Sequence, residues 1–193
     1  PQDFAKRLER DLWKILDAEF PAGAVPDAFE QETMRHEAYA APRRRLYLGG
    51  ERYVKALAGA LGRNKQRVLI EGASGGGKSA LIANWLNVHR QAHPKDLIHE
   101  HYLGASADAA DPHALVRRLI EAIRRTTQSS EDIPGDPQAM LDSLPTWLAT
   151  ANAWAGKHRT RWVVVLDALN GLTGLRDLRW LPAFLPARVH LVV

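Results

Sequence analysis

Apolar residues recur every three or four positions along much of this chain, which is the spacing of one helix face. Leu8, Leu12 and Ile15, for example, stand among charged residues and predict an amphipathic helix that ends near Pro21. A second helix is expected to stop at Pro42, because proline lacks a backbone N–H and clashes with the preceding turn. The helices predicted after the first cover residues 28–40, 51–61, 80–86, a segment that starts at Asp111-Pro112, and a segment started or kinked at Pro145 that runs through Trp154.

Short continuous apolar runs lie between these helical segments and predict buried strands. The runs cover residues 67–71, 97–103, 161–167 and 188–193. Because strands and helices alternate, we expect a parallel sheet with right-handed crossovers and helices on both faces, a three-layer α/β/α fold. We predict a helical segment with a linker over 1–42 and the α/β core over 43–193. The apolar run at 188–193 predicts a fragment cut before the last strand and lid of that core.

The strongest motif is a glycine-rich run between the strand at 67–71 and the helix that follows it. It reads Gly72-Ala73-Ser74-Gly75-Gly76-Gly77-Lys78-Ser79, a complete G-x-x-x-x-G-K-[ST] phosphate loop. Glycines allow successive backbone N–H groups to point inward at a helix N-terminus, which makes a nest for an anion. We predict that the cofactor-binding residues are Gly72, Ala73, Ser74, Gly75, Gly76, Gly77, Lys78, Ser79 and Ala80.

The residue types in this loop predict a nucleotide with a bound cation. Lys78 places a positive charge on the β- and γ-phosphates, and Ser79 offers a hydroxyl to Mg²⁺. The run 161–167 ends in Asp167, and an aspartate at the carboxyl end of a neighbouring strand can hold the water shell of that Mg²⁺. An aspartate after a strand can instead cap a helix or form a turn. We favour the metal role and predict that Ser79 and Asp167 hold the metal ion. The predicted cofactors are ATP or ADP with Mg²⁺, and the predicted fold is that of a P-loop NTPase.

Composition and charge add few constraints. The chain has 193 residues, no cysteine and a formal net charge of +4. The absence of cysteine fits a reducing compartment, and we expect a cytoplasmic protein without a membrane segment, since every apolar run is strand-sized. The densest basic run is Arg43-Arg44-Arg45. We favour a solvated face or an interdomain contact there over a nucleic-acid patch.

The segment that follows the predicted strand 161–167 narrows the class of protein. Asp167-Ala168-Leu169-Asn170-Gly171-Leu172 resembles the extended Walker B box of NACHT-type NTPases in the STAND class, including the NTPase regions of telomerase-associated protein, nephrocystin-like proteins and bacterial relatives. Trp180-Leu181-Pro182 makes the resemblance more specific than the phosphate loop alone. The further segments that carry it are 36–39, 43–49, 102–108, 185–186 and 189–193. The resemblance implies an ATP-operated signalling switch that self-associates in the full-length protein, with effector and sensor domains outside this chain.

Two positions depart from the pattern of that class. Asn170 stands where many of its members carry an acid, and an amide orients water but is no base at neutral pH. We therefore predict a slow ATP hydrolase with Lys78, Asp167 and Asn170 as catalytic residues. Gly50 replaces the arginine of a box that covers the adenine in STAND proteins, so this segment either lines the base with Tyr47 and backbone or is a plain strand-to-helix turn. Two alternatives stay open: a scaffold that binds nucleotide without hydrolysis, and a P-loop small-molecule kinase.

Several other polar and aromatic residues have ordinary structural interpretations. Ser106 and Asp108 follow the run 97–103 and either touch the ligand or form a turn, and we favour the turn. His99 and His101 alternate along a strand with no evident third metal ligand, so they do not predict a metal site. The tryptophans at 147, 154, 162 and 180 are expected in the core.

Overall fold

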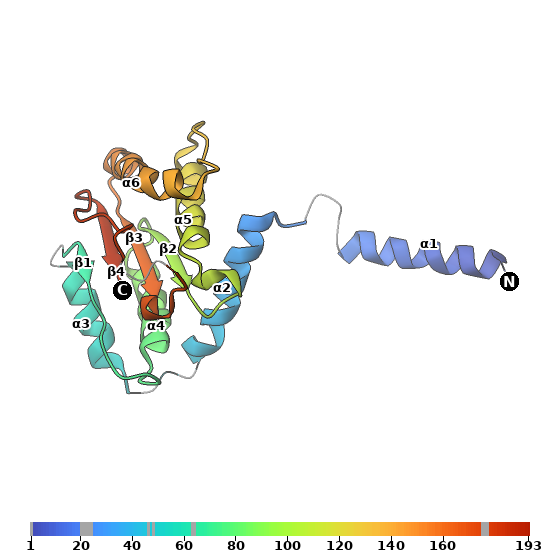
Figure 1. Cartoon of the computed structure of the whole chain (residues 1–193). Coiled ribbons are helices and arrows are strands. Elements are labelled where there is room, and N and C mark those ends of the chain that lie inside the picture. Colours follow the sequence, from blue (N-terminus) through green and yellow to red (C-terminus); the bar gives the residue numbers. More distant parts are fainter. Residues whose placement is uncertain (1, 20–24, 46, 48, 63–64, 175–177) are drawn as a thin grey trace. The chain divides into compact units, whose positions relative to one another are not determined.

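The structure is a computed structural model that describes residues 2–19, 25–45, 47, 49–62, 65–174 and 178–193 (Figure 1). The chain divides into two compact units, Pro1–Glu32 and Thr33–Val193. The boundary between the units lies within the second helix, α2 (Ala28–Arg45), whereas the sequence placed the start of the core at residue 43.

The first unit contains α1 (Gln2–Glu19), which ends where the apolar spacing predicted. The apolar stripe of this helix is solvent-accessible: Leu8, Leu12 and Ile15 are each about half exposed. The first turn of α2 is fixed by a reciprocal cap. The backbone N–H of Glu30 donates to Asp27 Oδ1 (2.9 Å), and the backbone N–H of Asp27 donates to Glu30 Oε2 (3.0 Å).

The second unit is built on four parallel strands in the order β1-β4-β3-β2. Their bounds are β1 (Arg67–Val68), β2 (Leu97–Tyr102), β3 (Trp162–Asp167) and β4 (Val189–Val192). Every residue of the central strand β3 is buried, which explains why its sequence is continuously apolar rather than alternating. β2 and β3 pair along their whole length, so Tyr102 lies opposite Asp167 at the carboxyl edge of the sheet.

Two buried clusters fill the two faces of this sheet. The side chains of β3 alternate between them: Val164 and Leu166 belong to one cluster, and Val163 and Val165 to the other. α5 (Pro112–Thr127) and α6 (Pro137–His158) complete the first cluster. α3 (Glu51–Gly62) and α4 (Lys78–Ala92) complete the second, which also includes Ala40 of α2.

Local signals in the sequence located the start of one helix and misplaced the boundaries of two others. The carboxylate of Asp111 accepts hydrogen bonds from the backbone N–H groups of His113 (3.3 Å) and Ala114 (3.1 Å), which confirms the predicted start of α5. The prediction that Pro42 stops the second helix is wrong, since α2 continues to Arg45. α6 begins at Pro137, so Pro145 lies inside it and does not start it.

The predicted fold class needs a correction. The described residues form six α-helices and only a small sheet of four short strands, so the chain is mainly helical and is not a clear three-layer P-loop NTPase fold. The largest difference is in the strand that leads into the phosphate loop. The sequence predicted it over 67–71, but β1 has only two residues, and Leu69 is 66% exposed. β1 is an edge strand, and among the described strands it pairs with β4.

Candidate functional site

The glycine-rich loop between β1 and α4 forms a tight turn. The backbone N–H of Gly76 donates to the carbonyl of Ala73 (3.1 Å). Gly75 and Gly77 have φ angles of +75° and +82°, in the left-handed region that L side chains rarely adopt. Gly77 is the residue that directly precedes α4, so the loop ends at a helix N-terminus where backbone N–H groups face outward.

Lys78 lies across this loop. Its ammonium group donates to the carbonyl oxygens of Gly72 (2.8 Å) and Ala73 (2.9 Å). The positive charge is thereby held over the loop backbone, next to the start of α4. A cation and a helix N-terminus together favour a bound anion.

Asp167, the last residue of β3, lies beside the start of α4. Its side chain is buried, and its Oδ2 atom has no hydrogen-bond partner. Burial raises the pKa of the Asp167 carboxyl, while the nearby Ser79 hydroxyl and the charges of Arg43 and Lys78 act in the opposite direction. A buried carboxylate oxygen without a partner is costly, and a cation bound there would remove that cost.

One cavity of about 840 Å³ joins these groups. The residues predicted from the sequence that line it are Gly72, Ser74, Gly75, Gly76, Gly77, Lys78, Ser79, Ala80, Asp167 and Asn170. Ala73 contributes through the carbonyl that Lys78 and Gly76 contact. Asn170 lies on a short 3₁₀ helix (Leu169–Gly171) and is exposed. Their roles as nucleotide, metal and catalytic residues remain predictions, but the fold brings all of these positions together.

Two charged residues that the sequence did not assign to the cavity also line it: Glu71, directly before the loop, and Arg43, at the end of α2. Only the basic run at 43–45 pointed to the end of α2, and it gave no indication which arginine faces the loop.

Tyr47, expected to lie near a nucleotide base, is not in the cavity lining and instead packs against Gly50. A Cβ at Gly50 would lie 1.9 Å from the Tyr47 ring, so only glycine fits there.

The remaining candidates have structural roles. Ser106 accepts a hydrogen bond from the backbone N–H of Ala109 (3.1 Å), which confirms the turn interpretation. Trp147, Trp162 and Trp180 are buried in the first core cluster, as expected. Trp154 is only partly buried and stacks on His158, with ring centroids 3.7 Å apart. Within the described ranges, no three His, Asp or Glu side chains are grouped so that they could hold a metal ion.

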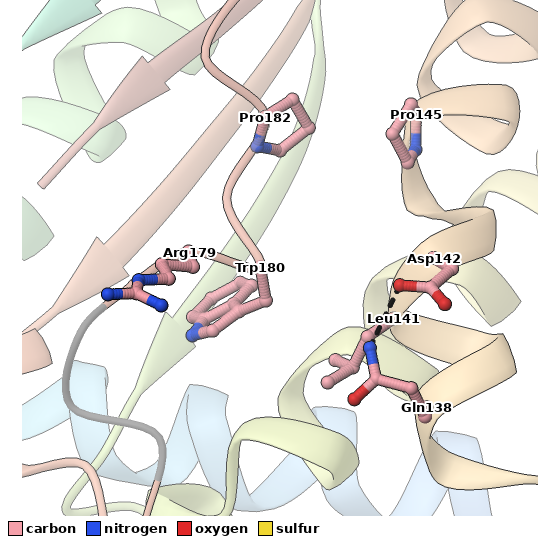
Figure 2. Close-up of a pocket in the computed structure, with 7 residues that line it drawn as sticks. All are labelled: Gln138, Leu141, Asp142, Pro145, Arg179, Trp180 and Pro182. Carbon is pink, nitrogen blue, oxygen red and sulfur yellow. Dashed lines mark hydrogen bonds between the residues drawn. The ribbon is translucent and has the colours of Figure 1, made fainter.

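The Trp180-Leu181-Pro182 segment borders a different cavity, of about 510 Å³, beside the first half of α6 (Figure 2). Figure 2 shows Trp180 and Pro182 on one side of it and Pro145 on the other, with Gln138 donating to Asp142 (2.9 Å) on the helix. This segment lines no part of the loop cavity, although Leu178, two residues before Trp180, does.

Comparisons with known proteins return distant relatives. A TPR repeat-containing protein of Dictyostelium discoideum is 24% identical over the whole of this chain. Human nephrocystin-3 is 26% identical over 65% of the chain, and human putative tetratricopeptide repeat protein 41 is 26% identical over 61% of it. The chain spans 16%, 9% and 10% of the lengths of these three relatives. No protein-family model and no solved structure matches the chain.

These findings correct the expectations drawn from the resemblance. The relatives are named for tetratricopeptide repeats or as nephrocystin-3, none is named as an NTPase, and no NACHT family model matches. The assignment to the STAND class, the enzymatic activity and the ATP-hydrolysing switch are therefore not retained. The catalytic role of Asn170 depended on that hydrolysis. Among the helices that the structure describes, none has the length and apolar character needed to cross a membrane.

Proposed function

We propose that this chain is the nucleotide-binding part of a protein-interaction scaffold, with Mg²⁺ and ATP or ADP bound as structural ligands and not turned over. The observation that carries the nucleotide proposal is the cavity at the loop 72–79. In it Lys78, the N-terminus of α4 and the buried carboxylate of Asp167 lie together. The scaffold role is supported by the names of the relatives, which describe tetratricopeptide repeat proteins.

The residues present fit a magnesium nucleotide. Asp167 Oδ2 is buried without a partner, and Ser79 lines the same cavity and acts on the same carboxylate. Mg²⁺ prefers oxygen ligands and keeps several waters, so two protein groups and the phosphate oxygens suffice. Lys78 and the N–H groups at the start of α4 would hold the phosphates. Because the proposed nucleotide is not hydrolysed, no residue has to act as a base that activates water.

The first test is binding by the unaltered chain. We expect MgATP and MgADP to bind in titration calorimetry and to raise the unfolding temperature, because a ligand that binds only the folded state stabilises it by mass action. At 100 times the dissociation constant the stabilisation is about 2.7 kcal/mol. A phosphate-release assay in the same buffer should show no turnover. The absence of both binding and stabilisation at millimolar MgATP would refute the proposal.

The role of Asp167 gives a second prediction. Asp167→Asn keeps the size of the side chain but removes its charge, so the affinity for ATP with Mg²⁺ should fall by about tenfold while the affinity measured in EDTA changes little. Asp142→Asn is the matched control, since Asp142 is exposed on α6 and lines the other cavity. An unchanged dependence on Mg²⁺ in Asp167→Asn would show that the cation is not held there.

A further inference from the structure

Arg43 is the second basic side chain at the loop cavity. It lies at the end of α2, far from the loop in sequence, yet it lines the same cavity as Lys78, Ser79 and Asp167. Arg43 and Lys78 both act electrostatically on the Asp167 carboxyl. Two cationic side chains and one buried carboxylate therefore line the space in which the phosphates would lie.

The Arg43 guanidinium is held in place by Tyr39, one turn earlier in α2. Arg43 Nη1 donates to the carbonyl of Tyr39 (2.6 Å), and the guanidinium carbon lies 3.4 Å from the centre of the Tyr39 ring. Tyr39 is itself fixed by Tyr102 at the end of β2, with ring centroids 5.3 Å apart, and by Gly104. A Cβ at Gly104 would come within 2.9 Å of the Tyr39 ring. An arginine positioned in this way loses little rotamer freedom when it binds a ligand.

The backbone of Arg43 is also joined to the helix that follows the loop. The side-chain amide of Asn84 donates to the carbonyl of Arg43 (3.1 Å) and to the carbonyl of Ala80 (2.8 Å), the residue after Ser79. The end of α2 is thus attached to the first turns of α4. A guanidinium carries five N–H donors and its bond to Tyr39 uses one, which leaves donors for a phosphate.

We propose that Arg43 is a phosphate-contacting residue that distinguishes a nucleoside triphosphate from a diphosphate at this site. The inference rests on the nucleotide proposal above. Ser79 and Asp167 would hold a magnesium ion that neutralises the β- and γ-phosphates, so the terminal phosphate of a bound triphosphate would lie on the Asp167 side of the cavity. Because Arg43 lines the same cavity as Asp167 and its charge acts on the Asp167 carboxyl, we place its contact at the terminal phosphate, which ADP lacks.

The test compares MgATP with MgADP by titration calorimetry on the full chain. Arg43→Gln should weaken ATP binding by about tenfold and ADP binding by less than about twofold, as expected for the loss of one charge-assisted contact. Arg43→Lys keeps the charge without the planar fork and serves as the second variant if Arg43→Gln lowers the unfolding temperature. Arg45→Gln is the matched control, since Arg45 is the exposed neighbour in the same helix.

The outcomes separate this inference from the nucleotide proposal. Equal weakening of ATP and ADP, or ATP affinity in both Arg43 variants equal to that of Arg45→Gln, would overturn the role of Arg43 while leaving the loop site intact. If wild-type protein binds neither nucleotide, or if Lys78→Met binds both as tightly as wild type does, the site itself is wrong and the role of Arg43 fails with it. A selective loss of ATP affinity in Arg43→Gln supports the inference.

Discussion

Lys78→Met should remove measurable nucleotide binding. Methionine keeps an unbranched stem but loses the ammonium group that bonds the carbonyl oxygens of Gly72 and Ala73 and lies across the loop. A hydrogen bond to a charged group contributes about 1.5–3 kcal/mol, and the ammonium would reach two phosphates, so we expect at least about a 100-fold loss of affinity for MgATP. Titration calorimetry and the shift in unfolding temperature measure it.

A control separates loss of the site from loss of charge. Lys55→Met changes the net charge equally, but Lys55 is exposed on α3 and lines no part of the loop cavity. It should bind MgATP as wild type does. Without nucleotide, both variants should unfold within a few degrees of wild type, since Lys78 is outside both core clusters. If Lys78→Met keeps micromolar affinity, the loop is a glycine-rich turn with no phosphate role.

Acidification from about pH 7.5 to about pH 5 should strongly destabilise the chain. His36 of α2 is buried, and its Nδ1 accepts the backbone N–H of Tyr102 (3.0 Å). Burial, Arg118 from α5 and His101 from β2 lower the pKa of His36 from 6.5 to about 2. Burial, with the same neighbours, also lowers the pKa of His99 on β2.

The direction in which the unfolding free energy changes with pH follows from proton linkage. Below pH 6.5 the unfolded chain protonates these histidines, whereas in the folded chain His36 stays neutral down to about pH 2. The stabilisation is therefore complete above pH 6.5 and declines as the pH falls. For His36 alone the loss between pH 7.5 and pH 5 is about 2 kcal/mol, and His99 adds to it in the same direction.

Urea unfolding at several pH values measures this effect. His36→Gln retains an acceptor for the Tyr102 N–H and should give a clearly smaller loss of unfolding free energy between pH 7.5 and pH 5. His93→Gln, an exposed histidine at the end of α4, should keep the wild-type dependence. An identical pH dependence in His36→Gln and wild type would contradict the assignment to this histidine.

Elements with strong local signals were predictable, and elements that depend on distant partners were not. β3 follows directly from its continuous apolar run, and α5 from Asp111 as a cap followed by proline. The extension of α2 through Pro42 was not predictable, because it depends on the burial of Ala40 and on the bond from Asn84 to the Arg43 carbonyl. The sequence also indicated a longer strand before the loop than the two residues that pair with β4.

The same contrast holds for the candidate site. The loop 72–79 and Asp167 could be predicted because their chemistry is concentrated in one motif and one strand end. Arg43 could not, because its position in the cavity depends on the Tyr39 ring, and the sequence distinguishes it in no way from its two arginine neighbours. Motif reasoning therefore located the side of the cavity formed by the loop and Asp167 and missed the side formed by α2.

The strand order has a consequence for how the chain folds as it is synthesised. β1 precedes the glycine-rich loop but pairs with β4, so Arg67 cannot pair until Leu191 has been synthesised. β2 likewise pairs with β3 across the length of α5 and α6. Non-local pairings of this kind form slowly and late. On a ribosome, the strand before the loop would stay unpaired until nearly the whole of this segment had emerged. A ligand of the loop would therefore bind only after the unit is complete.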